Sequence, residues 1–180
     1  MQSSEPVGRE TAAGLFFALV ARVRVPFTVN PPLTYLHSLT MRLSAFLRAA
    51  QQPDGGFAGR QGDSDLYYTS FALRGLAILG ELYGDVAQRA AAFLRARLAG
   101  RESLIDLMSL VFGAAQIDAA AGIDVFADAD NQWKTSLAQA LHALRCPDGG
   151  FAKGAGGTAG STYHTFLALL CLQLIDRPIA

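Results

Sequence analysis

The sequence is poor in net charge and in cysteine, and each shortage excludes a class of protein. Its 15 Lys and Arg residues balance 15 Asp and Glu residues, so the 180-residue chain has a net charge of zero. A nucleic-acid interface needs clustered Lys and Arg, and we therefore expect no nucleic-acid partner. The two cysteines, Cys146 and Cys171, are too few for a disulfide framework, which indicates a reducing compartment and a cytoplasmic location.

Long apolar runs are also missing, although 51% of the residues are hydrophobic. The stretch 12–21 (AAGLFFALVA) is too short to span a bilayer, and no basic start marks it as a signal peptide. We expect no transmembrane segment and interpret the stretch as part of a buried helix over about 11–24, with a membrane-surface helix as the alternative. Residues 1–10 are predicted to be a disordered tail, and residues 11–180 a single domain.

One five-residue motif occurs twice. Pro-Asp-Gly-Gly-Phe stands at 53–57 and again at 147–151, 94 residues later. Proline fixes φ, aspartate can bond its own backbone and glycine allows positive φ, so the motif predicts a tight turn. A turn that recurs between similar segments indicates a repeat architecture.

The segments between the turns alternate in character. Three of them have one apolar and one polar face, as amphipathic helices do: 36–50, 85–99 and 131–145. Three others are apolar on nearly every side: 66–80, 104–121 and 161–175. The alternation predicts an all-α fold in two layers, with inner helices covered on both sides. The 94-residue spacing equals two periods of 47 residues and places a degenerate middle turn at 100–102. The inner helices should then all begin at one end of the domain, where their N-termini would form an anion site.

Residues at the helix ends carry further signals. Asp85 followed by Gln88, and Ser103 followed by Asp106, each predict a cap at the start of a helix. Gly122 is suited to end the helix that Ser103 begins.

These motifs resemble those of the protein prenyltransferase β subunits and of the related squalene and hopene cyclases. The resemblance is carried by GGFAGR at 55–60, DLYYTSF at 65–71, TYHTF at 162–166 and the Gln-x-Pro-Asp-Gly-Gly-Phe turn that begins at Gln51. It covers about 35–175 and implies an α/α toroid of helix pairs around a central cavity for an isoprenoid. A closed toroid needs about twice as many helices, so the resemblance implies a partial ring.

Five residues are candidates for binding an isoprenoid diphosphate. The resemblance implies that Arg60, in the Gly-Gly-Phe-x-Gly-Arg motif, contacts the diphosphate beside Tyr67 or Tyr68. Tyr163 lies in the matching motif of the last repeat, and Lys153 closely follows the second Gly-Gly-Phe turn. Cations near helix N-termini suit a diphosphate. The alternatives are ordinary loop charges and an aromatic core.

The resemblance also implies a zinc site. In the family, zinc is held by an Asp-x-Cys pair at the start of one inner helix and a histidine at the start of a neighbouring one. His164 falls on that histidine and Asp65 near that aspartate, but Tyr67 stands where the cysteine is needed. Asp106 offers a second aspartate, with Met108 in the cysteine position. The structural alternatives are a core histidine for His164 and a helix cap for Asp65.

Two functions of different classes follow. The first is a prenyltransferase β-subunit-like protein that, if active, transfers the prenyl group to a thiol with zinc as its cofactor. The second is a non-catalytic α/α repeat scaffold that has lost the zinc site, and a terpene cyclase relative is a weaker third hypothesis. The sequence leaves open whether the chain is an enzyme. Open repeat ends expose apolar faces, so we expect a partner subunit or a homo-oligomer.

Overall fold

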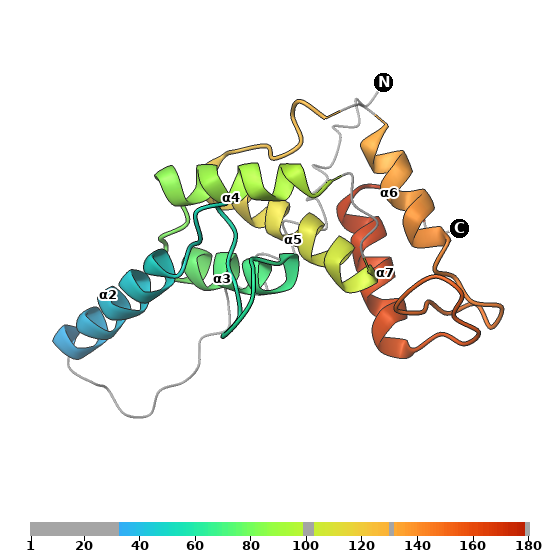
Figure 1. The fold of residues 1–180 in the computed structure, drawn as a ribbon, viewed down its shortest axis with the longest axis horizontal. Coiled ribbons are helices and arrows are strands. Elements are labelled where there is room, and N and C mark those ends of the chain that lie inside the picture. The colour runs from blue at the N-terminus through green and yellow to red at the C-terminus, as the bar shows by residue number, and fades with distance from the viewer. Residues whose placement is uncertain (1–32, 99–102, 130–131, 179–180) are drawn as a thin grey trace, which may run out of the picture. The chain divides into compact units, whose positions relative to one another are not determined.

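The computed structural model describes residues 33–98, 103–129 and 132–178. Within these ranges the regular structure consists of six α-helices in one compact unit, with isolated backbone bridges at the turns (Figure 1). The predicted all-α fold is therefore confirmed. The predicted tail at 1–10, the helix near 11–24 and the middle turn at 100–102 lie outside the described residues.

The helices alternate along the chain as predicted. Those with one polar face are α2 (Leu33–Ala49), α4 (Gly84–Ala96) and α6 (Trp133–His142). Those rich in apolar residues are α3 (Leu66–Ile78), α5 (Leu104–Ala121) and α7 (Thr162–Leu174). Each helix lies within a few residues of its predicted range, because hydrophobic periodicity locates a helix better than it locates the ends.

Each Pro-Asp-Gly-Gly-Phe motif folds into the predicted turn. The backbone φ is +89° at Gly55 and +87° at Gly149, a conformation that favours glycine. The aspartate of each motif accepts a hydrogen bond from the backbone two residues on, and the bond is 3.0 Å long in both copies: Gly56 N to Asp54 Oδ1 and Gly150 N to Asp148 Oδ1. The turn chemistry read from the sequence is thus the chemistry that the two turns use.

The phenylalanine of each motif joins the turn to the start of the next helix. Isolated antiparallel bridges pair equivalent residues in the two copies: Gln51–Phe57–Asp65 in the first and Arg145–Phe151–Ser161 in the second. The residues that precede the helices, Asp65 and Ser161, are 96 residues apart rather than 94. The second loop is therefore two residues longer than the first.

The two predicted layers are present. Helices α3, α5 and α7 pack as an inner row with α5 in the middle, and each outer helix packs on the inner helix that follows it. All three inner helices begin toward the same side of this unit (Figure 1). A single apolar cluster joins α3, α4 and α5 and includes Leu73, Leu94 and Ile117, each 0% exposed. The helix starts thus gather where the loops after the two turns lie.

The inner helices differ from the prediction in how far they are buried. Most of α5 is buried, whereas α3 buries four residues: Leu66, Thr69, Leu73 and Leu76. The prediction that α3 is covered nearly all round is therefore wrong. Within the described residues α5 has an inner neighbour on each side, but α3 and α7 have one each. An apolar sequence does not reveal how many neighbours a helix has.

Helix α5 also has the length and apolar composition of a membrane span. It is the one helix among the described residues with these properties, with a mean hydropathy of 1.5 over 18 residues. However, 61% of this stretch is buried within the protein, where it packs against α3, α4 and α7. A central core helix accounts for the same composition.

The helix caps follow the sequence at α5. Ser103 Oγ accepts a hydrogen bond from Asp106 N, and Asp106 Oδ2 accepts one from Ser103 N at 3.2 Å, which completes the predicted capping box. Gly122 ends the helix with a φ of +66°, also as predicted. The charge on Asp106 therefore serves the start of α5.

The predicted cap at Asp85 is wrong. Helix α4 begins one residue earlier, at Gly84, and its N-cap is Tyr83, which makes no side-chain cap bond. Gly84 has a φ of +60°, so the chain bends into the helix there and Asp85 falls inside the first turn. The Asp85 carboxylate instead lies 3.8 Å from the Arg89 guanidinium, one helical turn away.

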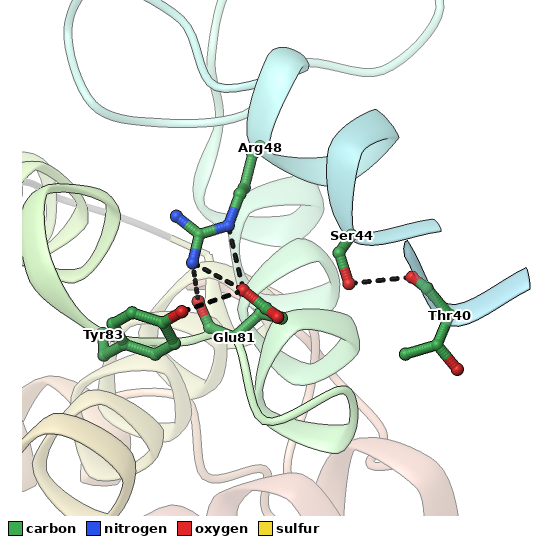
Figure 2. A network of polar contacts seen from close by, with 5 residues as sticks. All are labelled: Thr40, Ser44, Arg48, Glu81 and Tyr83. Atoms are coloured by element: carbon green, nitrogen blue, oxygen red, sulfur yellow. Dashed lines mark hydrogen bonds and ion pairs between the residues drawn. The ribbon is translucent and has the colours of Figure 1, made fainter. Parts of the chain in front are cut away.

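Polar side chains anchor α2 to the loop that follows α3. Ser44 is buried, and Arg48, one turn further, forms an ion pair with Glu81 at 2.6 Å (Figure 2). The Arg48 guanidinium also donates to the Glu81 carbonyl at 3.2 Å and lies 5.0 Å from the centre of the Tyr83 ring. The large apolar side chains on the other faces of α2 are exposed: Leu39, Met41, Leu43 and Phe46.

Candidate functional site

Helix α3 begins with a cap that fixes the first candidate residues. Asp65 has an extended backbone, and its Oδ1 accepts a hydrogen bond from Tyr68 N at 2.7 Å. This is the structural alternative weighed for Asp65, and it occupies one carboxylate oxygen with the helix start. Tyr67 and Tyr68 therefore stand in the first turn of α3 with their backbone fixed.

Helix α7 repeats this arrangement with different chemistry. Ser161 takes the place of Asp65, and its Oγ accepts from His164 N at 3.1 Å. The same Oγ lies 2.8 Å from His164 Nδ1. His164 is partly exposed and keeps Nε2 as its second ring nitrogen. The bond at Nδ1 orients the imidazole against the helix start.

A threonine in each copy ties the turn to its helix, and the sequence reading missed both. Thr69 Oγ1 accepts from Phe57 N at 2.9 Å, and Thr165 Oγ1 accepts from Phe151 N at 3.0 Å. The signal was available, because the two threonines hold the same place in Tyr-Tyr-Thr and Tyr-His-Thr. Their hydroxyls hold the turn against the helix, so the threonine of the motif is structural here.

Three aromatic rings at the start of α3 are exposed together. Tyr67 is 41% exposed, Tyr68 47% and Phe71 51%. The Tyr67 ring lies edge-on to both neighbours, 5.4 Å from the Tyr68 ring centre and 4.9 Å from that of Phe71. Gly59 in the preceding loop lies against Tyr68, since a Cβ there would be 2.7 Å from the ring. The loop that carries Arg60 is thus packed on this aromatic cluster.

The start of α7 adds a second exposed aromatic group. Tyr163 is 56% exposed, and its ring centre lies 5.4 Å from that of His164. Phe166, one turn further, is 57% exposed. Tyr163 corresponds to Tyr67, so both repeats place an exposed tyrosine directly after the helix start.

The two candidate cations lie in the loops between turn and inner helix. Arg60 and Lys153 are both exposed. The backbone carbonyl of Lys153 accepts a hydrogen bond from Leu104 N at 3.1 Å, which joins the loop before α7 to the start of α5. The backbone of Lys153 therefore lies beside the start of α5, in the loop that leads to α7.

The candidate zinc ligands are not brought together. Among the residues that the structure describes, no three His, Cys, Asp or Glu side chains form a group able to hold a metal ion. Asp65 caps α3, Asp106 belongs to the capping box of α5, and His164 pairs with Ser161. These residues do not fit a zinc site as they stand, and zinc stays a prediction from the resemblance.

The second turn contains a carboxylate that is held in its charged form. Asp148 accepts hydrogen bonds from Gly160 N at 2.8 Å and Gly150 N at 3.0 Å, and these bonds lower the pKa of its carboxyl group. Beside it lies an open pocket of about 470 Å³, bounded by Gly150, Phe166 and Leu169 among others. The sequence marked Asp148 as a turn residue and gave no sign of the pocket.

Taken together, paired helices, inner helices that start on one side and repeated Gly-Gly-Phe turns define an α/α repeat protein of the toroid type. The family model that describes the prenyltransferase alpha-alpha toroid domain matches residues 33–94 and 108–179. The chain therefore belongs to the prenyltransferase alpha-alpha toroid family, as its motifs predicted. No curated protein and no solved structure matches the chain.

Proposed function

We propose that this domain binds an isoprenoid diphosphate across the starts of its inner helices. The proposal rests on the exposed aromatic cluster of Tyr67, Tyr68 and Phe71 on α3. Large apolar groups that gather on a surface mark binding sites, and flat aromatic rings suit an unsaturated prenyl chain. Membership of the prenyltransferase toroid family supports this choice of ligand.

The diphosphate would lie at the helix starts, beside the aromatic cluster. Helices α3, α5 and α7 begin on the same side, and the positive ends of their helix dipoles favour an anion. Arg60 is in the loop packed on Tyr68, and Lys153 is next to the start of α5. Tyr163 adds a hydroxyl at the start of α7. Arginine can meet a phosphate with two parallel bonds, whereas lysine acts as a point charge.

We assign binding to this site and not transfer. In a transferase, zinc would lower the pKa of the acceptor thiol and so supply the nucleophile. Asp65, Asp106 and His164 do not form a metal group among the described residues, and no chemical step is assigned to them. What the chain's own residues can do is hold an anion and cover an apolar chain.

Calorimetric titration of the purified chain with geranyl, farnesyl and geranylgeranyl diphosphate tests the proposal. We expect binding that weakens about tenfold in Arg60→Ala and in Tyr68→Ala, because each change removes one contact worth about 1–2 kcal/mol. Arg42→Ala, which removes an exposed cation from α2, is the matched control and should bind normally. The free alcohol should bind more weakly than its diphosphate.

The second candidate function is a non-catalytic repeat scaffold. The observation that favours it is that Asp65 caps α3 and Asp106 completes the capping box of α5. Metal analysis together with the titration separates the candidates. Absence of binding for all three diphosphates would leave the scaffold, whereas one zinc per chain that disappears in His164→Ala would restore the transferase hypothesis.

A further inference from the structure

Helix α4 demonstrates how this fold seats an outer helix. It lies over the first turn, where the Arg89 guanidinium donates to the Gln52 carbonyl and Gln51 Nε2 donates to the Val86 carbonyl at 3.0 Å. Gly56 makes room for the Phe93 ring, since a Cβ at Gly56 would be 2.6 Å from that ring. We call this surface of the first turn, which includes Gln51, Gln52 and Gly56, the first seat. Phe93 is consequently only 4% exposed.

Helix α2 carries the same sequence without such a seat. Ala-Phe-Leu-Arg-Ala occurs at 45–49 in α2 and at 92–96 in α4, 47 residues apart, so Phe46 corresponds to Phe93. Phe46 is nevertheless 69% exposed, compared with 4% for Phe93. Leu39 and Leu43 share its face of the helix and are 42% and 44% exposed. The face that α4 buries is therefore open in α2.

The second turn and α7 present the complementary open surface. Leu169 and Leu170 correspond to Leu73 and Arg74 of α3, which lie on the face that the inner helix α5, not α4, covers with Gly113 and Phe112. Leu73 is fully buried, but Leu169 is half-buried and borders the open pocket with Gly150 and Phe166. A Cβ at Gly149 would meet nothing within 4 Å, whereas one at the equivalent Gly55 would be 2.2 Å from the Arg89 carbonyl oxygen. We call the surface of Gly150, Phe166 and Leu169 the second seat.

We propose that α2 of one copy of this chain docks in the second seat of another copy, as α4 docks over the first. The occupant is a second copy because α2 already carries the sequence that fills the equivalent seat within the chain. Phe46 then lies against Gly150 and Phe166. The Arg42 guanidinium donates to the Cys146 carbonyl, because these residues correspond to Arg89 and Gln52.

The charges favour this head-to-tail contact over a contact between two α2 helices. Arg42 and Arg48 are the charged residues of α2, so two α2 helices face to face would bring like charges together. Helix α7 contains no Lys, Arg, Asp or Glu. A head-to-tail contact between two copies can be formed twice, which closes a two-membered ring.

Light scattering of the full chain across micromolar concentrations tests the contact. We expect the mass of two chains of 19.1 kDa each. Phe46→Asp and Phe166→Asp should each weaken association on the order of 100-fold, because each buries a charge at the centre of the contact. Met41→Asp is the matched control, since Met41 is 54% exposed on a different face of α2 and should leave the mass unchanged.

Mixing the two variants makes the test directional. A Phe46→Asp chain keeps an intact second seat and a Phe166→Asp chain keeps an intact α2, so their mixture should regain one contact and form a mixed dimer. Association lost in Phe46→Asp but kept in Phe166→Asp would overturn the proposal, as would two monomeric variants that do not associate when mixed. A monomeric parent chain would mean that the face of α2 does not dock on a second copy, and would also overturn it. Circular dichroism confirms that each variant is folded.

Discussion

At the residue scale, the repeat depends on pairs of equivalent residues whose surroundings differ. Gly55 and Gly149 have nearly the same positive φ, +89° and +87°. A Cβ at Gly55 would collide with the Arg89 backbone of α4, whereas a Cβ at Gly149 would be in open space. Alanine at Gly149 therefore tests the cost of the backbone conformation alone, whereas alanine at Gly55 adds the cost of the collision.

Alanine at these two positions should be unequally destabilising. Gly149→Ala should lower the free energy of unfolding by about 1–2 kcal/mol, the cost of a left-handed conformation for a residue with a Cβ. Gly55→Ala should cost about 3 kcal/mol or more, because α4 must also move. Urea denaturation of both variants measures the difference. Equal losses would show that α4 does not press on the first turn as the structure has it.

The residues of the site could be predicted only in part. The cap at Asp65 was the structural alternative that residue type and position offered, because a cap is a local interaction. The roles of Thr69 and Thr165 did not follow, since each bonds a backbone group more than ten residues away. Whether aspartates and a histidine meet around a metal depends on distances between helices, which the motif cannot supply.

At the element scale, α2 is weakly buried, since Ser44 is its one buried residue among residues 37–49. Its one large contact with the loop after α3 is the Arg48–Glu81 pair, whose side chains are 34% and 24% exposed (Figure 2). Periodicity located α2 correctly, but it also predicted that the apolar face would point to the core. The face toward the domain instead includes Ser44 and Arg48.

Removing the anchor should loosen α2 without unfolding the protein. Arg48→Ala should speed amide hydrogen exchange in α2 severalfold while the global free energy of unfolding falls by less than about 1 kcal/mol. The Phe166→Asp background prevents any self-association from protecting the helix. Arg42→Ala removes an exposed cation from the same helix and serves as the control. Unchanged exchange in α2 would mean that Arg48 is not the anchor.

At the scale of the whole molecule, equivalent positions in the helix pairs differ in how deeply they are buried. Leu94 of α4 is 0% exposed and would lie 3.1 Å from a Cβ placed at Gly113 of α5. Leu47 of α2 has the same place in its helix and is only partly buried. The number of repeats and their order were readable from the turn spacing. The number of neighbours around each helix was not, because it depends on contacts between helices that are far apart in the sequence.

Truncating the two leucines should reveal this inequality. Leu94→Ala should cost about 2–5 kcal/mol, as expected for a cavity in a closed core, whereas Leu47→Ala should cost about 1 kcal/mol. Trp133, the single tryptophan, packs 4.5 Å from the Phe126 ring centre and reports unfolding by fluorescence. Similar losses in both variants would contradict the assignment of the core to the middle of the stack.

The bond between Leu104 N and the Lys153 carbonyl has a practical consequence. Because this bond joins two main-chain atoms, it does not depend on which side chain stands at position 153. Lys153→Glu would reverse a charge beside the start of α5 and leave the hydrogen bond between Leu104 N and the carbonyl of residue 153 intact. Substitutions at position 153 can therefore change the charge near the starts of the inner helices, and with it the ligands that bind there, while the backbone bond stays in place.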